Sequence, residues 1–220
     1  MKKLIIFDLD GTLVDTLADL AESTNQALAQ CGCLPHAQDE YRFFVGNGVN
    51  KLFERALPEG KRGVENVQRL RSLFMAHYDA HLTDKSAPYA GVLEVVKRLA
   101  DEGYKLAVAS NKYQSATERV VRDLFPGIPF YPVFGQREGV PRKPDPQIIE
   151  EILTLTGMTK GETLYVGDSA VDMQTGVNAG VMTCGVTWGF RARTELEAYN
   201  PKYIVNAPIE IYQAIQRENQ

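Results

Sequence analysis

Cysteine is scarce in this chain of 220 residues, which contains only Cys31, Cys33 and Cys184. Three cysteines cannot complete a disulfide framework, and the spacing of Cys31 and Cys33 lacks the second ligand pair that a zinc site requires. The chain also has no run of about 20 apolar residues, the length that a membrane-spanning helix needs. We therefore expect free thiols and no membrane partner.

Basic residues are also too few for a nucleic-acid-binding surface. Lysine and arginine number 24 against 28 aspartates and glutamates, which gives a net charge of -4. Affinity for a phosphate backbone needs concentrated positive charge, so we expect no nucleic-acid partner. The first apolar run stops after Phe7, too soon for the signal-peptide core of about 7 to 15 apolar residues. With 44% hydrophobic residues, the chain is expected to be a cytoplasmic globular enzyme, monomeric or homodimeric.

The N-terminal part of the chain contains one short predicted strand, Leu4–Phe7, followed by a segment of helical periodicity only. Apolar residues recur at helical spacing over three stretches: residues 17–31, 38–57 and 64–81. This helical segment, of roughly 65 to 70 residues, is too long for a plain connection. We therefore expect a small helical domain over residues 16–82, inserted into a core formed by residues 1–15 and 83–220.

From Pro88 onward, predicted helices alternate with apolar predicted strands. The helices cover residues 91–101, 115–124, 146–156 and 173–179. The strands cover residues 105–109, 131–134, 163–166 and 182–186. Such alternation indicates βαβ units in a parallel sheet covered on both faces. The expected fold class is α/β, a Rossmann-like parallel sheet with helices on both faces plus a small all-α domain inserted after the first strand.

Polar residues stand where the predicted strands end, and one lysine precedes a predicted helix. They are Asp8, Asp10, Ser110, Asn111, Lys143, Asp168 and Asp172. Ligands of open parallel sheets bind at the carboxyl ends of the strands, so we expect these side chains to meet. Crowded carboxylates must lose charge or share a hard cation, and oxygen ligands suit Mg²⁺. Lysine, serine and asparagine beside the metal would bind a phosphate, and Gly11 would let backbone amides approach it.

Four motifs in this order resemble those of the haloacid dehalogenase superfamily of phosphohydrolases, and the resemblance covers nearly the whole chain. The motifs are Asp8-Leu9-Asp10-Gly11-Thr12, Ser110-Asn111, Lys143 and Gly167-Asp168-Ser169-Ala170-Val171-Asp172. The resemblance implies that Asp8 is the nucleophile that forms an aspartyl-phosphate. It implies that Asp10 is first the general acid and then the general base.

The same resemblance implies where the metal and the phosphoryl group are held. Asp8 and Asp168 would bind Mg²⁺ directly, Asp10 through its backbone carbonyl, and Asp172 through water or as an anchor behind the ligands. The implied substrate-binding residues of the core are Thr12, Ser110, Asn111 and Lys143.

The inserted helical domain resembles the small mobile caps that close over small phosphate esters in part of this superfamily. Its segment Phe44–Leu57, and the later segment Gly185–Phe190, are similar to the corresponding stretches of phosphoglycolate phosphatases. Gly46 would turn the backbone at the edge of the cap, and Lys51 or Arg55 would supply a cation for a substrate carboxylate. The expected reaction is Mg²⁺-dependent hydrolysis of a small phosphorylated metabolite, 2-phosphoglycolate before others.

Several alternatives remain open from the sequence. A β-phosphoglucomutase-like phosphomutase, a pyrophosphatase or a nucleotidase would share the core, and a binding module would keep the fold without catalysis. Asp172 could cap the helix that follows it instead of serving the metal. The pattern does not decide whether Arg191 or Arg193 enters the site.

Overall fold

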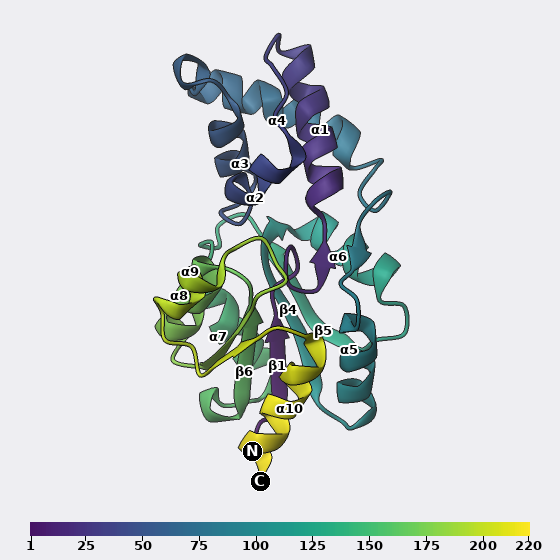
Figure 1. The fold of residues 1–220 in the computed structure, drawn as a ribbon, viewed down its shortest axis with the longest axis vertical. Helices are drawn as coiled ribbons and strands as arrows, with labels where there is room; N and C mark the ends of the chain where they lie inside the picture. Colours follow the sequence, from purple (N-terminus) through teal and green to yellow (C-terminus); the bar gives the residue numbers. More distant parts are fainter.

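A six-stranded parallel sheet forms the centre of the molecule in a computed structural model that describes residues 1–220 (Figure 1). Its order is β5-β4-β1-β6-β7-β8, and every neighbouring pair is parallel. The strands are β1 (Leu4–Phe7), β4 (Lys105–Tyr113), β5 (Phe130–Gln136), β6 (Thr163–Gly167), β7 (Met182–Val186) and β8 (Tyr203–Val205). The chain builds β4 and β5 on one side of β1 and then β6 to β8 on the other. The switch point of the topology, where such sheets bind ligands, therefore lies at the carboxyl end of β1 and its neighbours.

Helices cover both faces of the sheet because alternate residues of β1 point into two separate cores. Ile5 and Phe7 belong to the larger core, with side chains of α5, α6 and α10, whereas Leu4 and Ile6 pack with α7 and α8. These helices are α5 (Val92–Asp101), α6 (Gln114–Leu124), α7 (Gln147–Thr156), α8 (Ala170–Ala179) and α10 (Pro208–Asn219). None of the helices is both long and apolar enough to cross a membrane. The expected α/β fold class is confirmed.

Residues 16–86, between β2 and β3, form a bundle of helices beyond the carboxyl end of the sheet, at the top of Figure 1. The helices are α1 (Leu17–Gln30), α2 (Tyr41–Phe44), α3 (Val49–Ala56) and α4 (Val64–Tyr78). The chain enters and leaves the bundle through two short antiparallel strands, β2 (Val14–Asp15) and β3 (Ala87–Pro88). The ring of Phe74 lies between those of Phe53 and Tyr78, at centroid distances of 5.1 and 4.7 Å. The bundle thus has apolar packing of its own.

The structure goes beyond the sequence-based expectations at three places. The stretch of helical periodicity over residues 38–57 is divided in the structure, because Gly46 and Gly48 adopt φ angles of 110° and 83°, which glycine tolerates and other residues avoid, and so separate α2 from α3. β4 continues beyond the expected end at Ala109, because it resumes pairing with β5 after a shift of register. After Val186, the chain adds β8, α9 (Arg193–Glu197) and α10, for which we had no prediction.

Candidate active site

The ends of the three central strands bring predicted site residues together. Asp8 directly follows β1, Ser110 lies in the last part of β4, and Asp168 directly follows β6. These strands are adjacent and parallel, so the three side chains meet at one edge of the sheet. All three residues are buried, with exposed fractions of 8%, 2% and 2%. Residues up to 160 positions apart therefore share one site, as expected from the strand-end pattern.

Three carboxylates crowd the centre of this site. Asp8, Asp168 and Asp172 each offer an oxygen within 4.8 Å of the others, and all three residues are buried. Burial, followed by the charge of Asp172, raises the pKa of Asp8 to about 7. The same two causes raise the pKa of Asp168 well above its ordinary range, although the N–H of Phe190 opposes them. The surrounding protein therefore compensates the negative charges of Asp8 and Asp168 incompletely.

Lys143 is the cation of this centre, and it has more acceptors than hydrogens. Its Nζ lies 2.7 Å from Asp172 Oδ1, 2.9 Å from Asp8 Oδ1, and 2.9 Å from both the Ala109 carbonyl and the Tyr165 hydroxyl. An ammonium carries three hydrogens, which here go to the other three oxygens and leave Asp8 Oδ1 without one. Burial opposes the charge of Lys143, but Asp172 and Asp8 outweigh it and raise the lysine pKa.

Asn111 fixes the segment that carries Lys143. The Lys143 backbone N–H donates to Asn111 Oδ1 over 3.0 Å, and Asn111 Nδ2 donates to the Lys143 carbonyl over 3.1 Å. Asn111 Nδ2 also donates to the carbonyl of Gly46 in the helical bundle, over 3.0 Å. Asn111 thus orients the lysine through its backbone and connects the core to the bundle. Beside it, the Ser110 oxygen accepts from the Lys112 backbone N–H, which leaves the serine hydroxyl hydrogen for a ligand.

Asp172 is fully committed to groups of the protein. Its Oδ1 accepts from Lys143 and from the Tyr165 hydroxyl at 2.8 Å, and its Oδ2 accepts from the hydroxyl and backbone N–H of Ser169 at 2.6 and 3.2 Å. The Lys143 charge and these hydrogen bonds outweigh burial and lower the pKa of Asp172. Gly167 makes room for it, since a Cβ there would lie 2.2 Å from the Asp172 Cβ. Asp172 therefore has the geometry of an anchor for Lys143 and of a helix cap for α8.

The remaining carboxylates fit a hard divalent cation. Asp8 Oδ1 is buried without a hydrogen-bond donor, and a carboxylate oxygen in that condition suits Mg²⁺. Asp168 is oriented toward the same centre by the Phe190 N–H on its Oδ2, at 2.7 Å, and by the Thr12 hydroxyl on its Oδ1, at 3.4 Å. A Cβ at Gly11 would lie 2.5 Å from Asp168 Oδ2, so the cradle requires glycine there. Asp8 and Asp168 are the side chains that could hold the metal directly.

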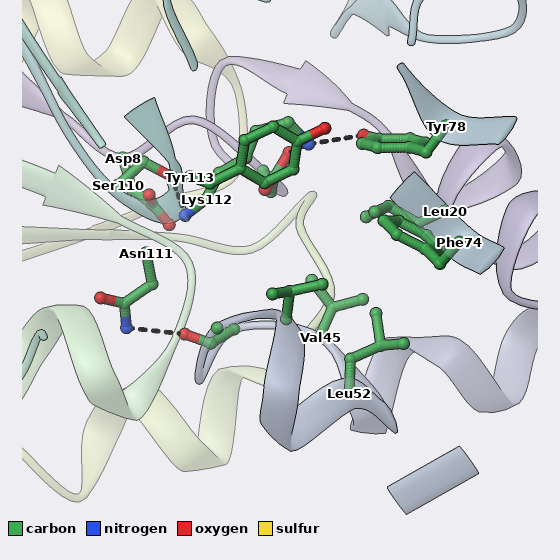
Figure 2. A pocket seen from close by; sticks show the side chains of 14 residues that line it. Asp8, Leu20, Val45, Leu52, Phe74, Tyr78, Ser110, Asn111, Lys112 and Tyr113 are labelled. Atoms are coloured by element: carbon green, nitrogen blue, oxygen red, sulfur yellow. Dashed lines mark hydrogen bonds and ion pairs between the residues drawn. The ribbon is translucent and has the colours of Figure 1, made fainter. Parts of the chain in front are cut away.

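Asp10 lies two residues beyond Asp8 and is connected to the helical bundle. Its Oδ1 accepts from the Thr16 hydroxyl at 2.8 Å and from Lys112 Nζ at 3.2 Å. Lys112 Nζ also donates to the hydroxyl of Tyr78, at the end of α4, over 2.5 Å (Figure 2). The side chains of Lys112 and Asp10 are only 3% and 13% exposed. A buried series of polar contacts thus runs from Asp10 in the core to Tyr78 in the bundle.

A small cavity lies between the strand ends and the bundle (Figure 2). Its polar side includes Asp8, Asp10, Ser110, Asn111 and Lys112, and Gly46 borders it from the bundle. The rest of the bundle side is mainly apolar, formed by Leu20, Val45, Val49, Leu52 and Phe74. The cavity measures about 40 Å³, which suits a few water molecules or a small organic group.

The cations that we expected from the bundle do not line this cavity. Lys51 pairs with Glu54 on the exposed face of α3, where its side chain is 54% exposed. Arg55 donates to the Phe44 carbonyl and to Asn47 Oδ1, and so braces the turn before α3. The expectation that Lys51 reaches the substrate is corrected, because α3 carries it away from the site. We had not singled out Lys112, although its position directly after Ser110-Asn111 was the available signal.

Arg191 joins the loop after β7 to the bundle. Its guanidinium donates to the carbonyls of Val45, at 2.8 Å, and Arg42, while Arg42 donates back to a carbonyl of the same loop over 3.2 Å. Arg193 instead pairs with Glu197 at the surface over 2.7 Å. Neither arginine lines the cavity: Arg191 lies at the junction of core and bundle, and Arg193 lies outside it.

The sequence matches a known family over most of its length. Residues 5–186 match the model of the haloacid dehalogenase-like hydrolases. The chain is 34% identical to a phosphoglycolate phosphatase of Mesorhizobium japonicum over 207 residues, which cover 93% of this chain and 91% of the relative. It is 31% identical to a phosphoglycolate phosphatase of Psychrobacter arcticus over 206 residues, which cover 91% and 90% of the two chains.

A solved structure agrees with these relatives. A predicted phosphoglycolate phosphatase from Haemophilus somnus 129pt superimposes with a TM-score of 0.90 at 28% identity, and the match covers 97% of this chain and 98% of the other. The chain therefore belongs to the haloacid dehalogenase-like hydrolase family, and within that family it is a phosphatase. The resemblance stated from the motifs is confirmed.

Proposed function

We propose that this member of the haloacid dehalogenase-like hydrolases is a Mg²⁺-dependent phosphomonoesterase that works through an aspartyl-phosphate, with 2-phosphoglycolate as its substrate. The observation that carries the proposal is the buried Asp8 Oδ1, which lies 2.9 Å from the Lys143 ammonium yet receives no hydrogen bond. A carboxylate oxygen beside a fixed cation and free of hydrogen bonds combines the conditions for binding a metal and for attack on phosphorus.

In the first step, a carboxylate oxygen of Asp8 forms a bond to phosphorus as the bond from phosphorus to the ester oxygen breaks. Asp10 supplies the proton that the departing alkoxide requires. Lys143 keeps a positive charge beside Asp8, where the charge of the phosphoryl oxygens gathers, and the Ser110 hydroxyl has its hydrogen free to donate to them. A bound Mg²⁺ supplies further compensation for negative charge at Asp8 and Asp168.

In the second step, a water molecule attacks the phosphorus of the aspartyl-phosphate. Asp10, now ionised, removes a proton from this water, and the bond from phosphorus to the Asp8 oxygen breaks to release inorganic phosphate. The Thr16 hydroxyl and Lys112 hold Asp10 Oδ1, so one carboxyl group keeps its place through both proton transfers. The free Asp8 carboxylate is then restored for the next turnover.

Three observations support a small substrate, and the first of them points to one with an acidic tail. The relatives from Mesorhizobium japonicum and Psychrobacter arcticus are phosphoglycolate phosphatases. The cavity beside Asp10 is small, about 40 Å³, which favours a small organic group over a sugar or a nucleoside. Its bundle side is mainly apolar and offers few partners for sugar hydroxyls. A phosphomutase acting on sugar phosphates and a nucleotidase are therefore disfavoured.

Residues 16–82 are proposed to act as a cap over a core formed by residues 1–15 and 83–220. In support, several of the polar contacts between the two parts gather around the cavity. They include Asn111 with Gly46, Lys112 with Tyr78, and Arg191 with Val45. Opening the cap would break these hydrogen bonds while leaving the packing inside the bundle intact.

Phosphate release from 2-phosphoglycolate tests the proposal. We expect turnover with Mg²⁺, none with EDTA, and a loss of at least about 1,000-fold in kcat for Asp8→Asn. Asp39→Asn is the matched control, since Asp39 has a side chain that is 90% exposed on the bundle, and it should leave kcat unchanged. Full turnover by Asp8→Asn would refute the assigned nucleophile. Turnover of pyrophosphate, nucleotides or glucose 1-phosphate in preference to 2-phosphoglycolate would refute the substrate.

A further inference from the structure

We propose that Lys112 binds the carboxylate of the substrate and thereby selects phosphoesters with a short acidic tail. This inference rests on the proposed function and adds to it the residue that binds the part of the substrate farthest from phosphorus. The sequence had pointed to Lys51 or Arg55 for this task, but both side chains are held elsewhere.

Lys112 is the only residue with a cationic side chain among the fourteen that line the cavity. Lys143 stands behind Asp8, bound to Asp172, and does not line the cavity. The other charged side chains of the cavity are those of Asp8 and Asp10, which repel a substrate carboxylate, and its remaining lining is neutral or apolar and cannot balance the charge. Charge complementarity therefore leaves Lys112 as the group able to receive it.

The hydrogen bonds of Lys112 leave one donor for a ligand. Its ammonium has three hydrogens and two acceptors within hydrogen-bond distance, Asp10 Oδ1 at 3.2 Å and the Tyr78 hydroxyl at 2.5 Å. Both acceptors belong to residues that border the cavity, so the ammonium is held at its wall (Figure 2). Because the side chain is only 3% exposed, water screens its charge weakly. A carboxylate that reached the third hydrogen would form a charge-assisted hydrogen bond.

The position of Lys112 also limits the length of the substrate. It lies two residues after Ser110 on the same strand, and Asp10, the proposed proton donor to the ester oxygen, is its direct neighbour. A substrate that places its phosphoryl group at Asp8 and its ester oxygen at Asp10 would therefore bring the start of its tail next to Lys112. The small cavity, of about 40 Å³, favours such a tail over a longer hydroxylated one.

Two inhibitors that differ only in the charge of the tail test this inference. They are 3-phosphonopropionate, which carries a carboxylate, and propylphosphonate, which ends in a methyl group. We expect the wild-type enzyme to bind the carboxylate compound more tightly, and we expect Lys112→Met to weaken that binding by about 10- to 100-fold while propylphosphonate changes by less than about threefold. Lys112→Arg should recover part of the preference, because it keeps the charge.

Lys51→Met is the matched control, since it removes a lysine from the exposed face of α3 and should leave both inhibition constants unchanged. Equal weakening of the two inhibitors in Lys112→Met would overturn the inference, because it would reveal a purely structural lysine. Should that variant fail to fold, equal binding of the two compounds to the wild-type enzyme would overturn it as well. Failure of the wild-type enzyme to hydrolyse 2-phosphoglycolate would instead count against the proposed substrate.

Discussion

The carboxylates of Asp8 and Asp172 both flank Lys143, but replacing Asp8 should raise the stability of the protein and replacing Asp172 should lower it. Asp8 and Asp172 each lie within 2.9 Å of the Lys143 ammonium, and asparagine is nearly isosteric with both. The fold, however, disfavours the charge of Asp8 and favours that of Asp172, since the pKa of the former is raised and that of the latter lowered. Without metal and above neutral pH, we expect Asp8→Asn to stabilise the protein and Asp172→Asn to destabilise it.

The size of the Asp8 effect follows from its pKa. One pKa unit corresponds to about 1.4 kcal/mol, so a rise from the ordinary 3.8 to about 7 makes charging Asp8 in the fold cost up to about 4 kcal/mol. The unfolded chain ionises Asp8 above pH 3.8, whereas the folded chain keeps the proton until about pH 7, so stability falls between these values. The neutral amide of the Asp8→Asn variant has no such dependence. The stability of the variant relative to the wild type should therefore increase between pH 4 and pH 8.

The size of the Asp172 effect follows from its hydrogen bonds. Its two oxygens accept four, from Lys143, Tyr165 and two donors of Ser169, and an asparagine would turn one acceptor into a donor. Breaking a buried ion pair costs about 3 to 5 kcal/mol, and the lower value applies because Lys143 keeps Asp8. At roughly 2 to 4 °C per kcal/mol for a chain of this size, Tm should fall by about 6 to 12 °C.

Thermal and urea unfolding of the three proteins in EDTA, at pH 4, 6 and 8, would measure both effects. We expect Asp8→Asn to match the wild type near pH 4 and to exceed it by up to about 4 kcal/mol at pH 8, with Asp172→Asn less stable throughout. Asp39→Asn serves again as the exposed control. An Asp8→Asn variant less stable than the wild type at pH 8 would refute the account of the charge cluster. An Asp172→Asn variant as stable as the wild type would show that Asp172 does not anchor Lys143.

Three further predictions address the metal, the cradle and the thiols. Millimolar Mg²⁺ at about 100 times its dissociation constant should stabilise the wild type by about 2.7 kcal/mol in a melting assay. Asp168→Asn should abolish most of this stabilisation, and an equal stabilisation of both proteins would exclude Asp168 as a ligand. Gly189→Ala should lower both Tm and kcat, because the new Cβ would lie 2.4 Å from Asp168 Oδ2, and unchanged values would contradict the tight cradle. A thiol reagent at pH 8 should modify Cys31 and Cys33 in the folded protein but not Cys184, since burial raises the pKa of the Cys184 thiol to about 12. Modification of all three thiols before unfolding would contradict the burial of Cys184.

Much of the sheet could be predicted because its signals are local. The apolar runs of β1, β6 and β7 are short, continuous and bounded by polar residues or turns, and β7 spans the residues 182–186 expected from the pattern. Helices α5 and α7 follow from their apolar spacing and the glycines after them. Over residues 38–57 periodicity indicated helical structure but not its division into α2 and α3, because it does not register the positive φ angles of Gly46 and Gly48.

The candidate site was predictable at the strand ends and much less so in the bundle. Asp8, Ser110 and Asp168 lie together because parallel strands end at a common edge, a rule that needs only the order of the elements. That rule does not tell which of Lys51 and Lys112 contacts the substrate, because both are lysines near glycine or polar runs. The orientation of α3 leaves Lys51 exposed, whereas the end of β4 places Lys112 at the cavity.

The sequence by itself determined the alternation of helices and strands and the kinds of side chain at each strand end, because backbone periodicity and polarity act over a few residues. The tertiary structure alone decided which groups touch. It paired Asp172 with Lys143, left Asp8 Oδ1 without a hydrogen bond, and closed Lys112 between Asp10 and Tyr78. Such contacts depend on distances of a few ångströms between separately formed elements, and those distances are set by how the helices and the sheet pack together.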